Sequence, residues 1–161
     1  MSEWFERFGF GAVGDSLLTG AYPLDADDVA ALAAAGVDEV YNLCEDVEYG
    51  DGERAAVAAA LAAAGITERR LSLTDYGNLP APALERATME VCAALAVGRR
   101  VYLHCRAGWQ RSAAVAAGVI ALREGLTIGG ALDRLRERRP AAEPLAHQTA
   151  DLLAWWEGRG G

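Results

Sequence analysis

A cysteine and an arginine with five residues between them occur in the segment His104–Ser112, which reads HCRAGWQRS. The apolar run Val101–Leu103 predicts a buried strand before it, and the alanine-rich run Ser112–Leu122 predicts a helix after it. Residues 105–111, which we call the phosphate loop, must therefore connect a strand end to a helix N-terminus. Backbone N–H groups in such a loop converge on one point, and the helix dipole adds positive potential there. The spacing predicts a site for a phosphoryl anion.

The side chains of this segment suit covalent phosphate transfer. We expect Cys105 at the base of the loop, where a positive field stabilises the thiolate that attacks phosphorus. Arg111 carries a planar guanidinium that can hold two phosphate oxygens, which a lysine point charge cannot do. Ser112 is expected to hydrogen-bond the sulfur when water releases the phosphate, and His104 to hold the loop rather than act as a base. The backbone of the remaining residues is expected to bind the phosphate: Arg106, Ala107, Gly108, Trp109 and Gln110.

A leaving alkoxide or phenoxide needs a proton, so a carboxylic acid must reach it from outside the phosphate loop. Asp75 is the candidate, because it lies 30 residues before Cys105, between the strand-like Leu71–Thr74 and the loop-forming Gly77–Pro80. A loop of this composition can move over a site and exclude water. A solvated turn aspartate is the alternative interpretation of Asp75.

Helical and strand patterns alternate along the chain and predict an α/β fold. We expect a central, mostly parallel sheet of four to five strands with helices on both faces, and the site at the carboxyl ends of the strands. The expected strands are 16–20, at an edge of the sheet, 37–43, 66–73 and 100–104. The expected helices are 25–35, 53–64, 83–97, 112–122, 126–139 and 144–156.

His104–Ser112 resembles the HC-x5-R-[ST] signature of the cysteine-dependent protein tyrosine phosphatase superfamily. With 161 residues the chain is too short for the receptor-type domains and resembles the compact dual-specificity branch over most of residues 16–155. The resemblance implies a dual-specificity phosphatase-like fold and hydrolysis of phosphomonoesters through a phosphocysteine, with Asp75 as the acid and with no cofactor or metal. A non-catalytic phospho-binding module is the alternative, and the joint presence of Cys105, Arg111 and Asp75 favours catalysis.

The substrate is less constrained than the chemistry, because many phosphomonoesters present the same dianion. A dual-specificity or tyrosine protein phosphatase is the first expectation. A phosphoinositide or phosphatidylglycerophosphate phosphatase is the second, because 40–45 resembles a strand of the phosphatase and tensin homolog, and 17–24 and 45–49 resemble mitochondrial phosphatidylglycerophosphate phosphatase. The phosphate loop lacks the two lysines of the inositide enzymes, which opposes a lipid. The sequence leaves open whether Trp109 faces the rim or the packing behind the loop.

The likeness to the phosphatase and tensin homolog also implies a redox partner for the nucleophile. Cys44 follows strand 37–43 and Cys105 follows strand 100–104, and these strands are expected to lie side by side. A sulfenic acid on Cys105 would then be trapped as a disulfide with Cys44. A small buried residue at a strand end is the alternative interpretation of Cys44.

Composition predicts one phosphatase domain over residues 1–161, with an N-terminal extension at 1–14 and a frayed tail at 158–161. The net charge is −8, and all 15 basic residues are arginines. An acidic body predicts neither nucleic-acid binding nor stable membrane association. The expected partner is a phosphorylated protein or small phosphomonoester, and the protein is expected to be a monomer. Three cysteines that form no closely spaced pair, and an N-terminus unlike a signal peptide, predict a cytoplasmic location.

Overall fold

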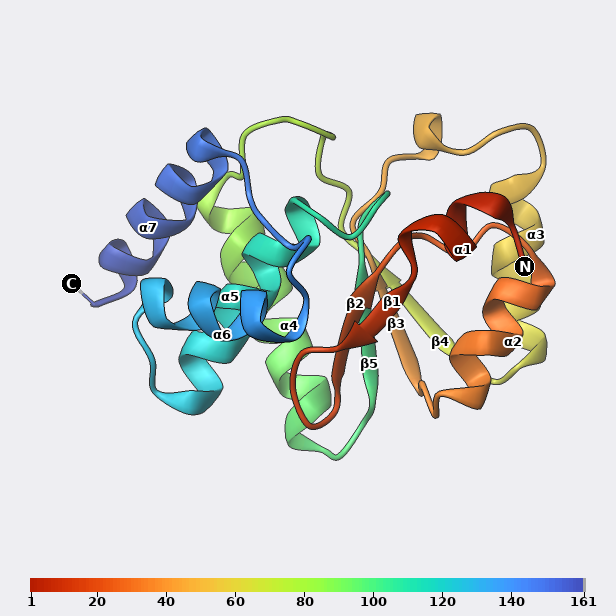
Figure 1. Cartoon of the computed structure of the whole chain (residues 1–161), viewed down its shortest axis with the longest axis horizontal. Coiled ribbons are helices and arrows are strands. Elements are labelled where there is room, and N and C mark those ends of the chain that lie inside the picture. The colour runs from red at the N-terminus through yellow and green to blue at the C-terminus, as the bar shows by residue number, and fades with distance from the viewer. Residues whose placement is uncertain (161) are drawn as a thin grey trace.

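The computed structural model describes residues 1–160 and contains a five-stranded sheet with helices on both faces (Figure 1). The strands are β1 (Phe10–Ala12), β2 (Leu17–Gly20), β3 (Glu39–Asn42), β4 (Thr67–Arg70) and β5 (Val101–His104). Their order is β1-β2-β5-β3-β4, and only the β1–β2 pair is antiparallel. The mostly parallel sheet predicted from the sequence is confirmed.

Strand β5 occupies the centre of the sheet and determines where the site lies. His104, its last residue, is level with Gly20 at the end of β2 and with Asn42 at the end of β3. Parallel strands end at a common edge, so the segments that follow β2, β3, β4 and β5 come together there, at the upper edge in Figure 1. Cys105, the next residue after β5, lies at this edge.

Seven α-helices and one 3₁₀ helix surround the sheet within the described residues. On one face lie α1 (Glu3–Phe8), α2 (Ala26–Ala34) and α3 (Glu53–Ala63). On the other face lie α4 (Ala81–Ala96), α5 (Arg111–Glu124), α6 (Ile128–Arg138) and α7 (Ala146–Gly160). The 3₁₀ helix η1 (Asp46–Glu48) follows β3 at the site edge.

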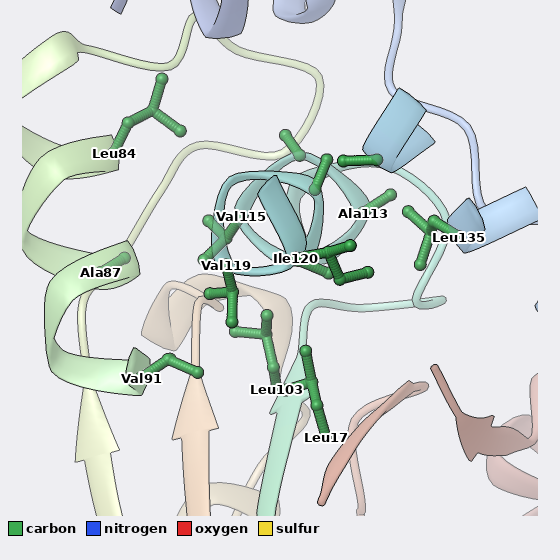
Figure 2. Packing of buried hydrophobic residues seen from close by; sticks show 14 of the residues in the cluster. Leu17, Leu84, Ala87, Val91, Leu103, Ala113, Val115, Val119, Ile120 and Leu135 are labelled. Atoms are coloured by element: carbon green, nitrogen blue, oxygen red, sulfur yellow. The ribbon is translucent and has the colours of Figure 1, made fainter. Parts of the chain in front are cut away.

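The strands divide their side chains between two apolar layers. Leu17 and Leu103 belong to the layer under α4–α7, and the next residue along β2, Leu18, belongs to the layer under α1–α3. Figure 2 shows Leu17 and Leu103 against Val119 and Ile120 of α5. Residues 111–121 of α5 are all buried, because α4, α6, α7 and the sheet surround this helix. The packing thereby fixes the helix that begins with Arg111.

Three details differ from the sequence expectations. Strand β2 is interior rather than at an edge, because β1 pairs with its outer side. Residues 1–14 contain α1 and β1, and Phe5 is buried in the core, so this segment packs as part of the fold. The tail expected to fray from 158 is helical to Gly160, while Gly161 lies outside the described residues.

No single helix within residues 1–160 has the length and apolar character needed to cross a bilayer. Helices α5 and α6 reach that threshold only when taken together, and they are bent by 112° at the break between them.

Candidate active site

Cys105 lies at the carboxyl end of the central strand and is almost fully buried. Its Sγ is 3.3 Å from the Oγ of Ser112, the second residue of α5. The hydroxyl is therefore placed to hydrogen-bond the sulfur, the contact predicted from the sequence. A donor at this distance stabilises a thiolate as a nucleophile and later as a leaving group.

The phosphate loop packs directly against the end of β2. Gly108 has a φ of +76°, and a Cβ added to it would lie 2.5 Å from the carbonyl carbon of Gly20. Only glycine tolerates both conditions. The loop is also fastened from outside, because the Arg106 carbonyl accepts the N–H of Tyr22 at 3.1 Å and the indole N–H of Trp4 at 2.7 Å.

Arg111 is fully buried, and one end of its guanidinium is held by Glu48. Nη1 and Nη2 donate to the two carboxylate oxygens of Glu48 at 2.8 and 2.6 Å, and Nη1 also donates to the Leu73 carbonyl at 2.8 Å. Burial opposes its charge, but the hydrogen bonds to Glu48 and the nearby thiols of Cys105 and Cys44 raise the pKa of Arg111 above its usual value. The cation is therefore permanent.

One donor of the Arg111 guanidinium is left without a partner within residues 1–160. Its Nε has no hydrogen-bond partner among the described residues. Nε and the neighbouring N–H of Nη2 form a planar pair of donors that matches two phosphate oxygens. Glu48 thus orients the guanidinium and leaves the buried Nε–H unpaired in the described part of the chain.

Asp75 lies beside this arginine on a tight turn after β4. Its carboxylate oxygen is 3.2 Å from Arg111 Nη2, and its side chain is one-quarter exposed. The turn is closed by a hydrogen bond from Gly77 N to Thr74 O at 2.9 Å. Tyr76, at the next position, has a φ of +59°, which is unusual for a residue other than glycine. The turn brings Asp75 to the same pocket as Cys105.

His104 is buried beneath the loop. Its Nδ1 is 3.1 Å from the Cys105 carbonyl oxygen. Burial, aided by the charge of Arg111 and opposed by this hydrogen bond, lowers the pKa of His104 to about 3. The ring is therefore neutral near pH 7 and donates its Nδ1–H to the loop backbone. The contact lies on the loop, where the sequence predicts it, while Nε2 has no hydrogen-bond partner among the described residues, and the loop-holding role stays a prediction.

The pocket in front of Cys105 has a volume of about 130 Å³. Trp109 is 42% exposed and packs edge-on against Phe8, with ring centroids 5.1 Å apart, so it stands at the rim. Arg106 lies over the ring of Trp4, 5.1 Å from its centroid. The residues that line the pocket are Trp4, Phe8, Asp75, Tyr76, Cys105, Arg106, Ala107, Trp109 and Gln110.

The sequence profile of the dual specificity phosphatase catalytic domain matches residues 23–157. The chain belongs to this family. The phosphatase therefore carries its cysteine, arginine and aspartate in a domain whose chemistry is cysteine-based phosphate ester hydrolysis. A search of curated proteins returned no match.

Solved structures share the fold of this phosphatase over nearly their whole length. The active form of Tk-PTP is 21% identical, with a TM-score of 0.79 over 92% of this chain and 96% of that one. PTPMT1 is 23% identical, with a TM-score of 0.79 over 93% and 95% of the two chains. Human DUSP28 is 24% identical, with a TM-score of 0.73 over 94% and 95%. These similarities support the fold inferred from the sequence.

Cys44, the predicted redox partner, does not line the pocket, and neither do His104, Gly108, Arg111 and Ser112, which lie behind or beneath it. It is buried beyond the end of β3, and its backbone N–H donates to Asn42 Oδ1 at 2.8 Å. Burial, together with the charges of Glu48 and Cys105, raises the pKa of the Cys44 thiol. β3 and β5 are adjacent, as the redox hypothesis requires. The hypothesis itself stays a prediction.

Sequence reasoning missed Glu48, Trp4 and Phe8 in the site of this phosphatase. A buried arginine needs a carboxylate partner, and the acidic segment 45–48 contains candidates for it. Glu48 lies over 60 residues before Arg111 in the sequence, so no local pattern indicates that the two side chains pair. Trp4 and Phe8 stood in the segment interpreted as an extension. Within residues 1–160 no cluster of three His, Cys, Asp or Glu side chains is arranged to hold a metal ion.

Proposed function

We propose that this phosphatase hydrolyses phosphotyrosine, and more slowly phosphoserine or phosphothreonine, in protein substrates through a phosphocysteine intermediate. The observation that supports it is an aromatic wall around a reactive-cysteine pocket: Trp4, Phe8, Tyr76 and Trp109 line the space in front of Cys105. Aromatic side chains pack edge-on or offset against a phenyl ring. A phenyl phosphate can thus insert its ring among these residues while its phosphate reaches the loop.

The first step forms the bond between Cys105 Sγ and phosphorus and breaks the bond between phosphorus and the ester oxygen. The phosphate loop and the Nε and Nη2 donors of Arg111 hold the three equatorial oxygens during this transfer. Asp75, protonated at the start, gives its proton to the departing oxygen, which leaves as an alcohol or phenol. The result is phosphocysteine and an Asp75 carboxylate.

The second step returns the enzyme to its starting state. Water attacks phosphorus, and the Asp75 carboxylate takes one of its protons. The Sγ–P bond breaks, inorganic phosphate departs, and Cys105 leaves as a thiolate that the Ser112 hydroxyl stabilises from 3.3 Å. His104 stays neutral and holds the loop throughout.

The size of the pocket favours a single phosphorylated side chain. A volume of about 130 Å³ is well below the roughly 300–1,000 Å³ of sites that enclose drug-sized molecules. A second groove, lined by Pro140, Pro144 and Leu145 among others, shares Trp109 and Gln110 with the pocket. The continuous surface is suited to residues that flank a phosphotyrosine in a polypeptide.

A phosphoinositide or phosphatidylglycerophosphate is the second candidate substrate. The similar structure of PTPMT1 in complex with PI(5)P, 21% identical with a TM-score of 0.79 over 94% of this chain and 99% of that one, favours it. The net charge of −8 opposes it, because anionic bilayers repel an acidic protein. The predicted cytoplasmic location and monomeric state accompany the protein-substrate proposal and stay predictions.

A turnover panel with one rim variant tests the assignment. Phosphotyrosine peptides, phosphothreonine peptides, and vesicles that carry phosphatidylglycerophosphate or PI(5)P are compared by kcat/KM. We expect the phosphotyrosine peptides to have the highest kcat/KM. Trp109→Ala should lower that value by about tenfold, which corresponds to about 1.4 kcal/mol of ring contact, while the kcat/KM of free alkyl phosphates should change little. Trp156→Ala, an aromatic truncation on the far part of α7, is the matched control. Lipid turnover well above peptide turnover assigns the second candidate instead.

A further inference from the structure

The first two turns of α7 contact the segment that carries Asp75, defined here as the acid loop, residues 74–79. Gln148 of α7 is fully buried. Its Nε2 donates to the carbonyl of Gly77 at 3.2 Å, and its Oε1 accepts the backbone N–H of Leu145 at 3.0 Å. Both ends of the amide are thus engaged, and its orientation is fixed. The acid loop is tied to the helix from inside the protein.

Two neighbours of Gln148 reach the same loop. His147 Nε2 lies 3.0 Å from the Tyr76 carbonyl and 3.2 Å from the Gly77 carbonyl. Asp151, one turn further along α7, accepts the backbone N–H of Leu79 at 2.8 Å. Three side chains of one helix therefore bind backbone groups at 76, 77 and 79, just after Asp75.

The other end of the acid loop is tied to the sheet and to the catalytic arginine. Leu73 donates its N–H to the Leu43 carbonyl at 2.9 Å and accepts from Arg111 Nη1 at 2.8 Å. Between these anchors the turn is tight, because a Cβ on Gly77 would lie 2.9 Å from the Thr74 carbonyl oxygen. The left-handed backbone of Tyr76 persists only where surrounding contacts determine it, and His147 of α7 binds the carbonyl of that residue.

From this arrangement we infer that His147, Gln148 and Asp151 are positioning residues, which hold Asp75 over the leaving oxygen and make the acid loop a fixed element of the site. The inference rests on the proposed role of Asp75 as the general acid. Proton transfer requires the acid within hydrogen-bond reach of the departing atom, and a displacement of about 1 Å can lower a rate by about 10²-fold. An activated leaving group departs with little help from an acid, so the contribution of the loop can be separated from that of Cys105 by changing the leaving group.

Leaving-group dependence tests the inference, with Gln148→Leu and His147→Ala as variants. We expect Gln148→Leu to lower kcat for phenyl phosphate by about 10-fold or more, with KM nearly constant, and to change the rate for nitrophenyl phosphate by less than about threefold, because the activated leaving group needs little proton. His147→Ala, at an exposed position, should show a smaller loss with the same selectivity. In the Asp75→Asn background each variant should cause no further loss, because the group it positions is gone.

Controls separate positioning from general loss of structure. Leu153→Ala changes an exposed residue of the same helix and should leave both rates unchanged. Thermal unfolding of each variant reports its folded fraction, and His147→Ala carries the test if Gln148→Leu is unfolded. Equal losses for both leaving groups, or losses that add fully to that of Asp75→Asn, would overturn the inference. If Asp75→Asn itself slows the turnover of both substrates equally, Asp75 is not the general acid. If Asp75→Asn slows only phenyl phosphate and the α7 variants show no such selectivity, only the positioning role is refuted.

Discussion

Replacing Gly108 with alanine would test whether the packing of the phosphate loop against β2 determines the catalytic geometry. The new methyl group would meet the backbone of Gly20, with the carbonyl carbon 2.5 Å and the carbonyl oxygen 2.7 Å away. Gly20 cannot withdraw easily, because a Cβ at its own position would already lie 2.4 Å from Phe10 Cβ, which shows how closely β1 covers it. The loop must therefore move.

Two costs add in this variant. A left-handed backbone costs a residue with a Cβ roughly 1–2 kcal/mol, and the overpacked contact costs about 1–3 kcal/mol more. A total of about 2–5 kcal/mol corresponds to a fall in Tm of roughly 4–20 °C for a chain of this length. We expect kcat/KM to fall with it by about 10²-fold or more, because a shift of about 1 Å misplaces the N–H groups around Cys105.

Gly98→Ala is the matched control for Gly108→Ala. Gly98 has a φ of +83° and lies after α4, and no described atom beyond its chain neighbours is within 4 Å of a Cβ built there. This control carries the backbone cost alone, about 1–2 kcal/mol, and should keep full activity. Thermal unfolding and steady-state kinetics on the two variants measure the difference. Equal destabilisation, or an active Gly108→Ala enzyme, would refute the argument from the Gly20 contact.

Three further predictions concern the titratable and nucleophilic groups. Cys105→Ser should abolish turnover yet retain vanadate binding, while Arg111→Lys should lose both; activity of Cys105→Ser in metal-free buffer would exclude the phosphocysteine. The folded pKa of His104, about 3, lies below its ordinary 6.5, so the stability it contributes is complete above pH 6.5 and falls by roughly 1.4 kcal/mol per pH unit down to about 3. Chemical denaturation should show a shallower acid decline in His104→Asn, and an unchanged decline would contradict the buried neutral ring. Peroxide-treated enzyme should yield a Cys44–Cys105 peptide and recover its activity with dithiothreitol. Recovery should be slow, because burial raises the pKa of the Cys44 thiol and makes it a poor leaving group. Permanent inactivation of both wild type and Cys44→Ser would exclude the disulfide.

Local patterns in the sequence were enough to locate the base of the site. The short apolar run of β5 and the Cys105–Arg111 spacing depend on neighbours within a few residues, so they can be recognised without a structure. The position of Asp75 followed from a strand that gives way to a loop. These features placed the nucleophile, the arginine and the aspartate at one edge of a parallel sheet, as the structure does.

The remaining features depend on contacts between distant segments. Strand β1 has only three residues, too few for a recognisable alternation, and its pairing depends on β2 being present. The bond between Glu48 and Arg111 joins η1 to α5. His147 is an exposed residue, and its contacts with the carbonyls of Tyr76 and Gly77 exist only after α7 docks, so no local pattern could show them.

Helix α1 contributes to the pocket wall that meets the substrate, while the catalytic groups lie on other elements. Its inner side chain, Phe5, anchors it in the core, while Trp4 and Phe8 stand in the pocket wall. A change of Phe8 can reshape the wall and leave the closely packed base formed by Gly20 and Gly108 intact, whereas a change of Trp4 also removes the indole hydrogen bond to the Arg106 carbonyl. A six-residue helix is thus a module through which selection, or directed evolution in the laboratory, can retarget this phosphatase without rebuilding its catalytic loop.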